Sequence, residues 1–142
     1  MTTINPWINF NGNAEEVFTF YKSVFGGEFT SKVRFKDMDS GMPIAEGEGD
    51  RIMHVSLPVG QGTILMASDF SGSMGPVKMG NNFTIAIGPD SEQEADRLFK
   101  GLSAGGTVTM PMAKAFWGSY FGMFTDKFGI QWMVNYDYNQ QK

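Results

Sequence analysis

The chain contains no cysteine and a single histidine, His54, among its 142 residues. The absence of cysteine excludes a disulfide framework, a thiolate metal site and a cysteine nucleophile. A single histidine excludes any metal site built from two or more imidazoles. Basic residues never occur side by side and the net charge is −4, so nucleic acid and anionic membranes are poor candidates as partners.

Long apolar stretches are also absent. None approaches the roughly 20 residues that a membrane helix needs, and no signal peptide is recognisable before the first strand-like segment. We therefore expect a cytoplasmic protein with no membrane association. Hydrophobic residues make up 42% of the chain, which is enough apolar surface to form a folded core in one domain of this length.

The usual motifs of nucleophilic and nucleotide chemistry are missing as well. There is no Gly-x-Ser-x-Gly, and the glycines at 60–62 and 72–75 lack the lysine of a phosphate-binding loop. Residues 11–13 read Asn-Gly-Asn, where a methyltransferase that uses S-adenosylmethionine would carry a glycine-rich loop after its first strand. We therefore expect no chemistry with that cofactor.

The apolar residues that are present follow strand and helix periods. Residues 4–10 alternate, with Ile4, Ile8 and Phe10 on the expected core face. Asn13 and Ser91 are expected to cap two helices, which end at the glycine pairs 26–27 and 105–106. Further strands are expected at 28–35, 51–59, 63–68, 83–88, 107–112, 120–125 and 131–136, with a polar loop at 36–50 and a hairpin around 60–62.

The two halves of the sequence share a register. Both halves are expected to have the element order βαβββ, and this shared order together with the shared register favours a duplicated module. We expect an α+β fold in one domain, with a first module at 3–68, a connector at 69–82 and a second module at 83–137. Identical pairs that lie 79 positions apart include Glu15 and Glu94, Phe20 and Phe99, Gly26 and Gly105, and Gly27 and Gly106.

Tandem βαβββ modules with a glycine pair after each helix resemble the vicinal oxygen chelate superfamily, which includes glyoxalase I, extradiol dioxygenases, and fosfomycin and bleomycin resistance proteins. The segments WINFNGNAEEVFTFYKSVFGG, MHVSLPVG, ILMASD and FWGSYFGMFTDKFGIQWMVN are similar to its PhnB-like branch. Members of that branch often carry the label 3-demethylubiquinone 3-methyltransferase, which these residues do little to support. The resemblance implies curled mixed sheets with helices on their outer faces, a ligand cavity in each sheet and, commonly, a homodimer.

The resemblance also implies a divalent metal held by the first and last strands of each module, where it polarises a substrate with adjacent oxygens. Neutral oxygens and thioethers are poor ligands for such metals, so we expect no metal and no cofactor. Strand parity puts Asn5, Met66, Thr84 and Met133 at the ligand positions, and a slip of one residue gives Pro6, Leu65, Phe83 and Trp132, which are no better.

His54 is the candidate catalytic residue, because imidazole exchanges protons near physiological pH. His54 and Ser56 alternate with apolar residues and are expected on the concave side of their strand. A histidine that only donates a hydrogen bond from the cavity wall is the alternative. Glu46, Glu48 and Asp50 precede the strand, either as carboxylate partners or a weak cation site, or as solvated loop charge.

An apolar cavity for a small molecule is the expected site. Residues 115–124 include five aromatic side chains, which line the cavity, line a dimer interface, or pack in the core. Asp69 either closes over a polar group of the ligand or caps a turn. The expected cavity residues are Asn5, Trp7, Asn9, His54, Ser56, Met66, Asp69, Thr84, Trp117, Tyr120, Gln131 and Met133.

Three functions are compatible with these patterns. The leading hypothesis is a metal-independent protein that binds a small molecule in an apolar cavity, as a homodimer. The second is an enzyme of glyoxalase type, a lyase, isomerase or dioxygenase, that recruits a metal through His54. The third is a structural homodimer without an open cavity.

Overall fold

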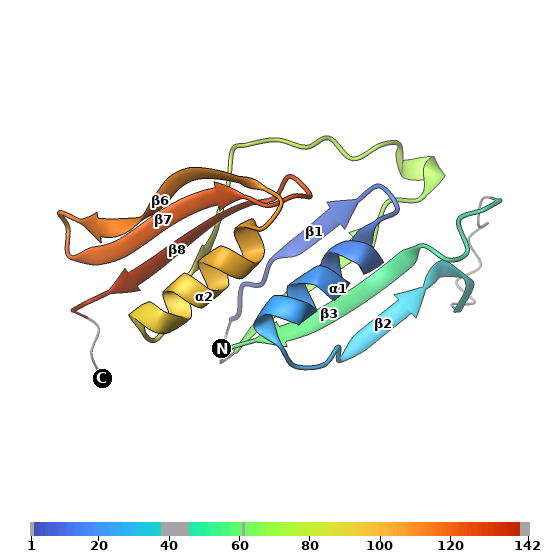
Figure 1. The fold of residues 1–142 in the computed structure, drawn as a ribbon. Helices are drawn as coiled ribbons and strands as arrows, with labels where there is room; N and C mark the ends of the chain where they lie inside the picture. Colours follow the sequence, from blue (N-terminus) through green and yellow to red (C-terminus); the bar gives the residue numbers. More distant parts are fainter. Residues whose placement is uncertain (1, 38–45, 61, 140–142) are drawn as a thin grey trace. The chain divides into compact units, whose positions relative to one another are not determined.

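The computed structural model describes residues 2–37, 46–60 and 62–139. The chain divides into two compact units, residues 1–78 and 79–142. Each unit contains one α-helix and one four-stranded mixed sheet, in the strand orders β1-β4-β3-β2 and β5-β8-β7-β6 (Figure 1). In both sheets the first strand runs parallel to the fourth and the other neighbours are antiparallel. The α+β fold of two tandem βαβββ modules is confirmed.

Every expected helix and strand is present. Unit 1 contains β1 (Trp7–Phe10), α1 (Ala14–Phe25), β2 (Ser31–Arg34), a short 3-10 helix (Phe35–Asp37), β3 (Ile52–Val59), β4 (Thr63–Asp69) and a second 3-10 helix (Gly72–Met74). Unit 2 contains β5 (Ile85–Ile87), α2 (Glu92–Ser103), β6 (Thr107–Ala115), β7 (Ser119–Thr125) and β8 (Gln131–Asp137). Residues 38–45 of the polar loop and Gln61 of the hairpin lie outside the described residues.

The first strand of each unit begins later than the sequence indicates. Ile4 is 92% exposed, so its assignment to a core face is wrong, and Phe83, near the start of the second module, is 73% exposed. Pro6 has no N–H to donate to a ladder, and β1 starts immediately after it. The backbone carbonyl of Phe83 accepts a hydrogen bond from the Gln131 side chain and the β5 ladder starts only at Ile85.

The two helices are capped in different ways. The hydroxyl of Ser91 accepts from the backbone N–H of Glu94 at 3.0 Å, as expected of an N-cap serine. Asn13 occupies the N-cap position of α1, but its side chain makes no capping hydrogen bond. The carboxylate of Asp69, at the end of β4, accepts from the first N–H of α1 instead.

The glycine pairs lie at the ends of the helices for steric reasons. Gly26 and Gly105, the first members of the two pairs, adopt φ angles of 81° and 77°, which side chains rarely tolerate. A Cβ atom at Gly106 would lie 2.2 Å from the carbonyl oxygen of Thr125, so the chain can pass this point of β7 only with glycine. The expected role as helix terminator is therefore correct for the first pair, since Gly26 is the C-cap of α1, whereas Ala104 is the C-cap of α2 and the second pair follows it.

A compact core lies between helix and sheet within each unit. Helices α1 and α2 each bury one apolar stripe against the strands, and burial of this apolar area is the main favourable contribution to folding. In unit 1 the largest buried side chains are Phe18, Tyr21, Ile52, Leu57 and Leu65, and in unit 2 they are Leu102, Phe124, Trp132 and Val134. In the described part of the chain, neither helix is long and apolar enough to cross a membrane.

The expected connector, 69–82, is attached to unit 1 over much of its length. Asp69 is the last residue of β4, and the next N–H, of Phe70, donates to the carbonyl of Phe10. The side-chain amide of Asn11 then holds the backbone of Val77 through both of its polar atoms. The first nine residues of the connector thus follow the surface of unit 1.

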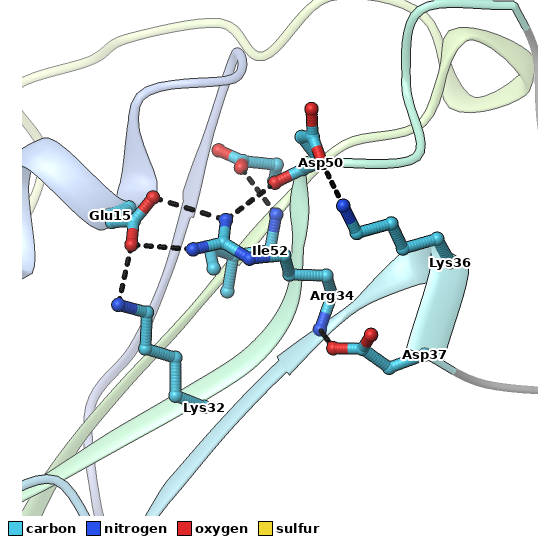
Figure 2. A network of polar contacts seen from close by, with 8 residues as sticks. Glu15, Lys32, Arg34, Lys36, Asp37, Asp50 and Ile52 are labelled. Carbon is cyan, nitrogen blue, oxygen red and sulfur yellow. Dashed lines mark hydrogen bonds and ion pairs between the residues drawn. The ribbon is translucent and has the colours of Figure 1, made fainter.

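A cluster of charged residues joins α1 to β2 and to the loop before β3. Figure 2 shows the carboxylate of Glu15 facing Lys32 and Arg34: Arg34 donates two hydrogen bonds to it, at 3.0 and 2.7 Å, and the Lys32 ammonium lies 2.5 Å away. Arg34 also donates to the carbonyl of Asp50, whose carboxylate pairs with Lys36. The hydrogen bonds from Arg34 and Lys32 lower the pKa of Glu15 from 4.5 to about 2.

The lowered pKa of Glu15 predicts a pH-dependent contribution to stability. Because the folded-state pKa lies below the ordinary value of 4.5, the contribution is present above pH 4.5 and is lost as the pH falls towards 2. The Glu15 side chain is 41% exposed, so we expect Glu15→Gln to lower the free energy of unfolding at neutral pH by no more than about 1 kcal/mol.

Urea unfolding of both proteins between pH 7 and pH 2 measures this effect. The difference between wild type and Glu15→Gln should shrink through the acid range, whereas Glu16→Gln, an exposed neighbour on the same turn, should match wild type throughout. A difference that stays constant down to pH 2 would contradict the assignment.

Candidate functional site

The sheet of unit 1 has one face under α1, here called the helix face, and an opposite face, here called the open face. Successive side chains of a strand alternate between the two. Lys32 and Arg34 pair with Glu15 of α1, and Asp69 binds the start of α1, so all three lie on the helix face. These three are the only charged residues in the sequences of β1–β4.

The open face is formed by neutral residues. Trp7 and Asn9 come from β1, His54 and Ser56 from β3, and Met66 and Ser68 from β4, each at the parity opposite to the buried core residues. Direct Cα pairing places Trp7 beside Met66, Asn9 beside Ser68 and Ser56 beside Met66. The sequence assigned Trp7, Asn9, His54, Ser56 and Met66 to one surface, and the structure brings these five together.

Trp7 and His54 form an aromatic pair at the centre of this face. Their ring centroids lie 4.8 Å apart with the planes tilted by 42°. The indole Nε1 of Trp7 donates to the Ser68 hydroxyl at 2.8 Å, and Nδ1 of His54 shares a hydrogen bond of 2.9 Å with the Ser31 hydroxyl. These hydrogen bonds fix the orientation of both rings, and Trp7 is still 50% exposed to solvent.

The serines around the aromatic pair are the part of the site that sequence reasoning missed. Ser31 and Ser68 hold the rings, and Ser56, only 5% exposed, pairs its hydroxyl with that of Thr30 at 2.7 Å. Parity along β4 could have found Ser68, two residues after Met66. Ser31 could not be found in this way, because it is the Cα partner of Ser56 and reaches His54 diagonally, which depends on the register between β2 and β3.

The positions expected to replace metal ligands are not arranged as a donor set. Asn5 lies before β1, and its carbonyl oxygen accepts from the backbone N–H of Ile64 at 2.9 Å. Thr84 lies before β5. The Cα partner of Met133 in β5 is Ala86, and the Cα partner of Met66 in β1 is Trp7. Neither methionine is therefore paired with the first-strand residue that was expected beside it.

No three His, Cys, Asp or Glu side chains gather in the described residues. The donors on these strands are therefore a poor fit to the hard divalent cation that the family resemblance implies.

Asp69 was expected to face the cavity, and the structure places its carboxylate inside unit 1. The residue is 2% exposed. One oxygen accepts from the backbone N–H groups of Gly12 and Ala14, both at 2.9 Å, and the other accepts from the N–H of Ile52 at 2.8 Å. The side chain therefore connects β4 to α1 and β3, and all three bonds are internal.

Two of the three loop carboxylates make structural contacts. Glu48 accepts from the N–H of Gly72 at 2.9 Å and pairs with Arg51. The Asp50 carboxylate pairs with Lys36, which lowers its pKa through that hydrogen bond, and Glu46 is exposed. Glu46 and Asp50 are exposed, as expected of solvated loop charge, whereas the Glu48 side chain is only 13% exposed.

In unit 2 the expected site residues separate onto the two faces of the sheet. Tyr120 lies on the face of the unit 2 sheet that is under α2. Its hydroxyl donates to Asp96 of α2 at 2.7 Å, and this contact raises the pKa of Tyr120. Trp117 meets Phe121 edge to face at 5.4 Å between centroids. Met133 is the Cα partner of Met123, and the Gln131 amide is bound to the backbone before β5.

Comparisons with known proteins agree with this architecture. The family model described as Glyoxalase/Bleomycin resistance protein/Dioxygenase superfamily matches residues 4–134. The chain is 27% identical over 143 residues to Protein YjdN of Escherichia coli (strain K12), covering 93% of each.

Two solved structures extend the comparison. Protein PA1353 from Pseudomonas aeruginosa is 41% identical, with a TM-score of 0.84 over 96% of this chain and 98% of that one. A putative 3-demethylubiquinone-9 3-methyltransferase, PhnB protein, from Bacillus cereus is 26% identical, with a TM-score of 0.71 over 95% and 99% of the two chains.

The internal role of Asp69 predicts a large stability effect. Asp69→Ala leaves three backbone N–H groups without their acceptor, and we expect it to lower the free energy of unfolding by roughly 2–4 kcal/mol. Urea unfolding with an unchanged m-value measures the loss. Asp90→Ala removes an exposed aspartate and should change stability by less than about 0.5 kcal/mol. Equal stability of the two variants would refute the assigned role.

Proposed function

This chain belongs to the glyoxalase/bleomycin resistance protein/dioxygenase superfamily, with its PhnB-like resemblance confirmed, and we propose that it binds a small molecule on the open face of unit 1 without a resident metal. The observation that carries the proposal is the Trp7–His54 pair. A half-exposed indole is held in place by Ser68, so its contact surface is ordered before a ligand arrives. Such preorganisation reduces the entropy cost of binding.

The surroundings of the pair support a binding surface. Met66 supplies a polarizable thioether beside Trp7, while Asn9, His54 and Ser68 supply polar groups on the same face. A few polar groups on an apolar wall are typical of small-molecule sites.

The rival proposal, a metal-dependent lyase, isomerase or dioxygenase, has less support. It requires His54 to recruit a cation together with loop carboxylates or substrate oxygens, and the loop carboxylates nearest in sequence, Glu48 and Asp50, are paired with Arg51 and Lys36. Proton transfer by His54 on a bound ligand needs no metal and is compatible with the binding proposal.

The homodimer remains a prediction, and the proposal assigns the ligand to unit 1, without the contribution from Trp117 and Met133 of unit 2 that the sequence indicated. The methyltransferase name of the Bacillus cereus relative gains no support from the loop before α1. The N–H of Gly12 in that loop is bound to Asp69, whereas a nucleotide-binding loop needs free N–H groups for its ligand.

A thermal-shift screen of aromatic compounds tests the binding proposal. A compound present at about 100 times its Kd stabilises the folded state by about 2.7 kcal/mol, which raises the Tm by roughly 5–10 °C for a chain of this size. We expect Trp7→Leu to abolish the shift. Trp117→Leu removes a tryptophan of equal exposure, 51% against 50%, from the other unit and should retain it. A shift lost only in Trp117→Leu would move the site to unit 2.

A metal titration tests the rival. Protein purified without chelator is dialysed against Zn²⁺, Ni²⁺, Mn²⁺ or Fe²⁺ and its metal content is measured. We expect no stoichiometric uptake that depends on His54. Tight uptake of one ion per chain that disappears in His54→Ala would establish the metal-dependent alternative.

A further inference from the structure

We propose that the open face of unit 1 selects neutral, flat molecules that carry a hydrogen-bond-accepting oxygen, and that Ser31 acts as the positioning residue that presents the Nε2–H of His54 to that oxygen. This inference rests on the proposed function and names the chemical class of its ligand. Three independent features of the face lead to it: its charge, the shape of the aromatic pair, and the hydrogen-bond partners of the two rings.

Charge is sorted completely between the two faces of this sheet. Lys32 and Arg34 are turned to Glu15 of α1, and the carboxylate of Asp69 is enclosed by backbone N–H groups. No formally charged side chain of β1–β4 is left for the open face. A charged ligand would lose hydration there without an ionic partner, which is costly, so a neutral ligand is favoured.

The aromatic pair favours a flat ligand. The Trp7 indole is half exposed and is fixed by its bond to Ser68, so it offers a rigid planar surface. The His54 ring, 4.8 Å away and tilted by 42°, borders that surface on one side. Offset or edge-to-face contacts with a planar ring gain more than contacts with a saturated ring of similar size.

The hydrogen bonds of the face determine which nitrogen of the two aromatic rings is left for a ligand. The indole N–H of Trp7 is already donated to Ser68, and the hydroxyl of Ser56 is paired with Thr30. The hydroxyl of Ser31 lies 2.9 Å from Nδ1 of His54. When this hydroxyl donates to Nδ1, the proton of the neutral imidazole lies on Nε2. The Nε2–H group is then the ring donor that the neighbouring serines leave for an accepting oxygen.

The tautomer of the His54 ring can be measured in the free protein by ¹⁵N NMR. His54 is the only histidine, so the signals of its ring nitrogens are unambiguous. We expect the neutral ring to carry its proton on Nε2. Ser31→Ala should yield a mixture of both tautomers, and Ser31→Thr, which keeps the hydroxyl, should restore the single form. A neutral wild-type ring protonated on Nδ1 would overturn the role of Ser31 and leave the binding proposal intact.

Four small probes then test the ligand class in the wild-type protein: benzamide, benzoate, benzamidinium and cyclohexanecarboxamide. Binding is followed through the His54 ring and Trp7 indole signals. We expect benzamide to bind at least tenfold more tightly than each of the others, because it alone combines neutrality, a flat ring and a carbonyl oxygen. Ser31→Ala should weaken benzamide by about 2- to 12-fold, the range of one hydrogen bond, with Ser31→Thr close to wild type.

The outcomes separate the two proposals. Tighter binding of benzoate or benzamidinium, with shifts at Trp7 and His54, would overturn the selectivity for neutral molecules while supporting a binding site on this face. Equal binding of benzamide and cyclohexanecarboxamide would overturn the preference for flat ligands. If none of the four probes, up to their solubility limits, shifts the signals of Trp7 or His54, both this inference and the proposed function fail.

Discussion

The buried carboxylate of Asp69 is the interaction on which the arrangement of unit 1 depends. A carboxylate removed from water needs several donors, and here it has three backbone N–H groups, one in the loop before α1, one at the start of α1 and one at the start of β3. These bonds fix α1 to one face of the sheet, and the opposite face is left for Trp7 and His54. Asp126 has a similar role in a turn of unit 2, where it accepts from two backbone N–H groups and from the indole of Trp132.

Much of the fold could be predicted because its signals are local. The alternation of apolar residues located every strand, Ser91 was correctly identified as a cap, and the glycine pairs marked where both helices end. The cap of α1 could not be predicted from local patterns, since Asp69 lies 55 residues from Ala14 and the nearby Asn13 offered a plausible alternative. Ile4 was assigned to the core because it fits the alternation, but alternation does not reveal where the partner strand stops pairing.

Only some of the residues of the candidate site could be predicted from the sequence. Parity correctly grouped Trp7, His54 and Met66 on one face, because β1, β3 and β4 are regular where these residues lie. Tyr120 was expected in the cavity but lies under α2, since aromatic residues occupy both faces of β7 and only the position of α2 distinguishes them. Ser31 required the pairing of two strands separated by a long loop. The residues that hold the aromatic rings were therefore harder to find than the rings themselves.

The central claim is that this sheet retains the architecture of its family while presenting neutral and aromatic side chains where the family resemblance implies a metal. The most direct test is a crystal structure of protein that is purified from cells without chelator and crystallised in the presence of benzamide. The account predicts planar density against Trp7 with a carbonyl oxygen within hydrogen-bond distance of His54 Nε2. A metal ion coordinated by side chains of β1 and β4, or benzamide bound only elsewhere, would contradict it.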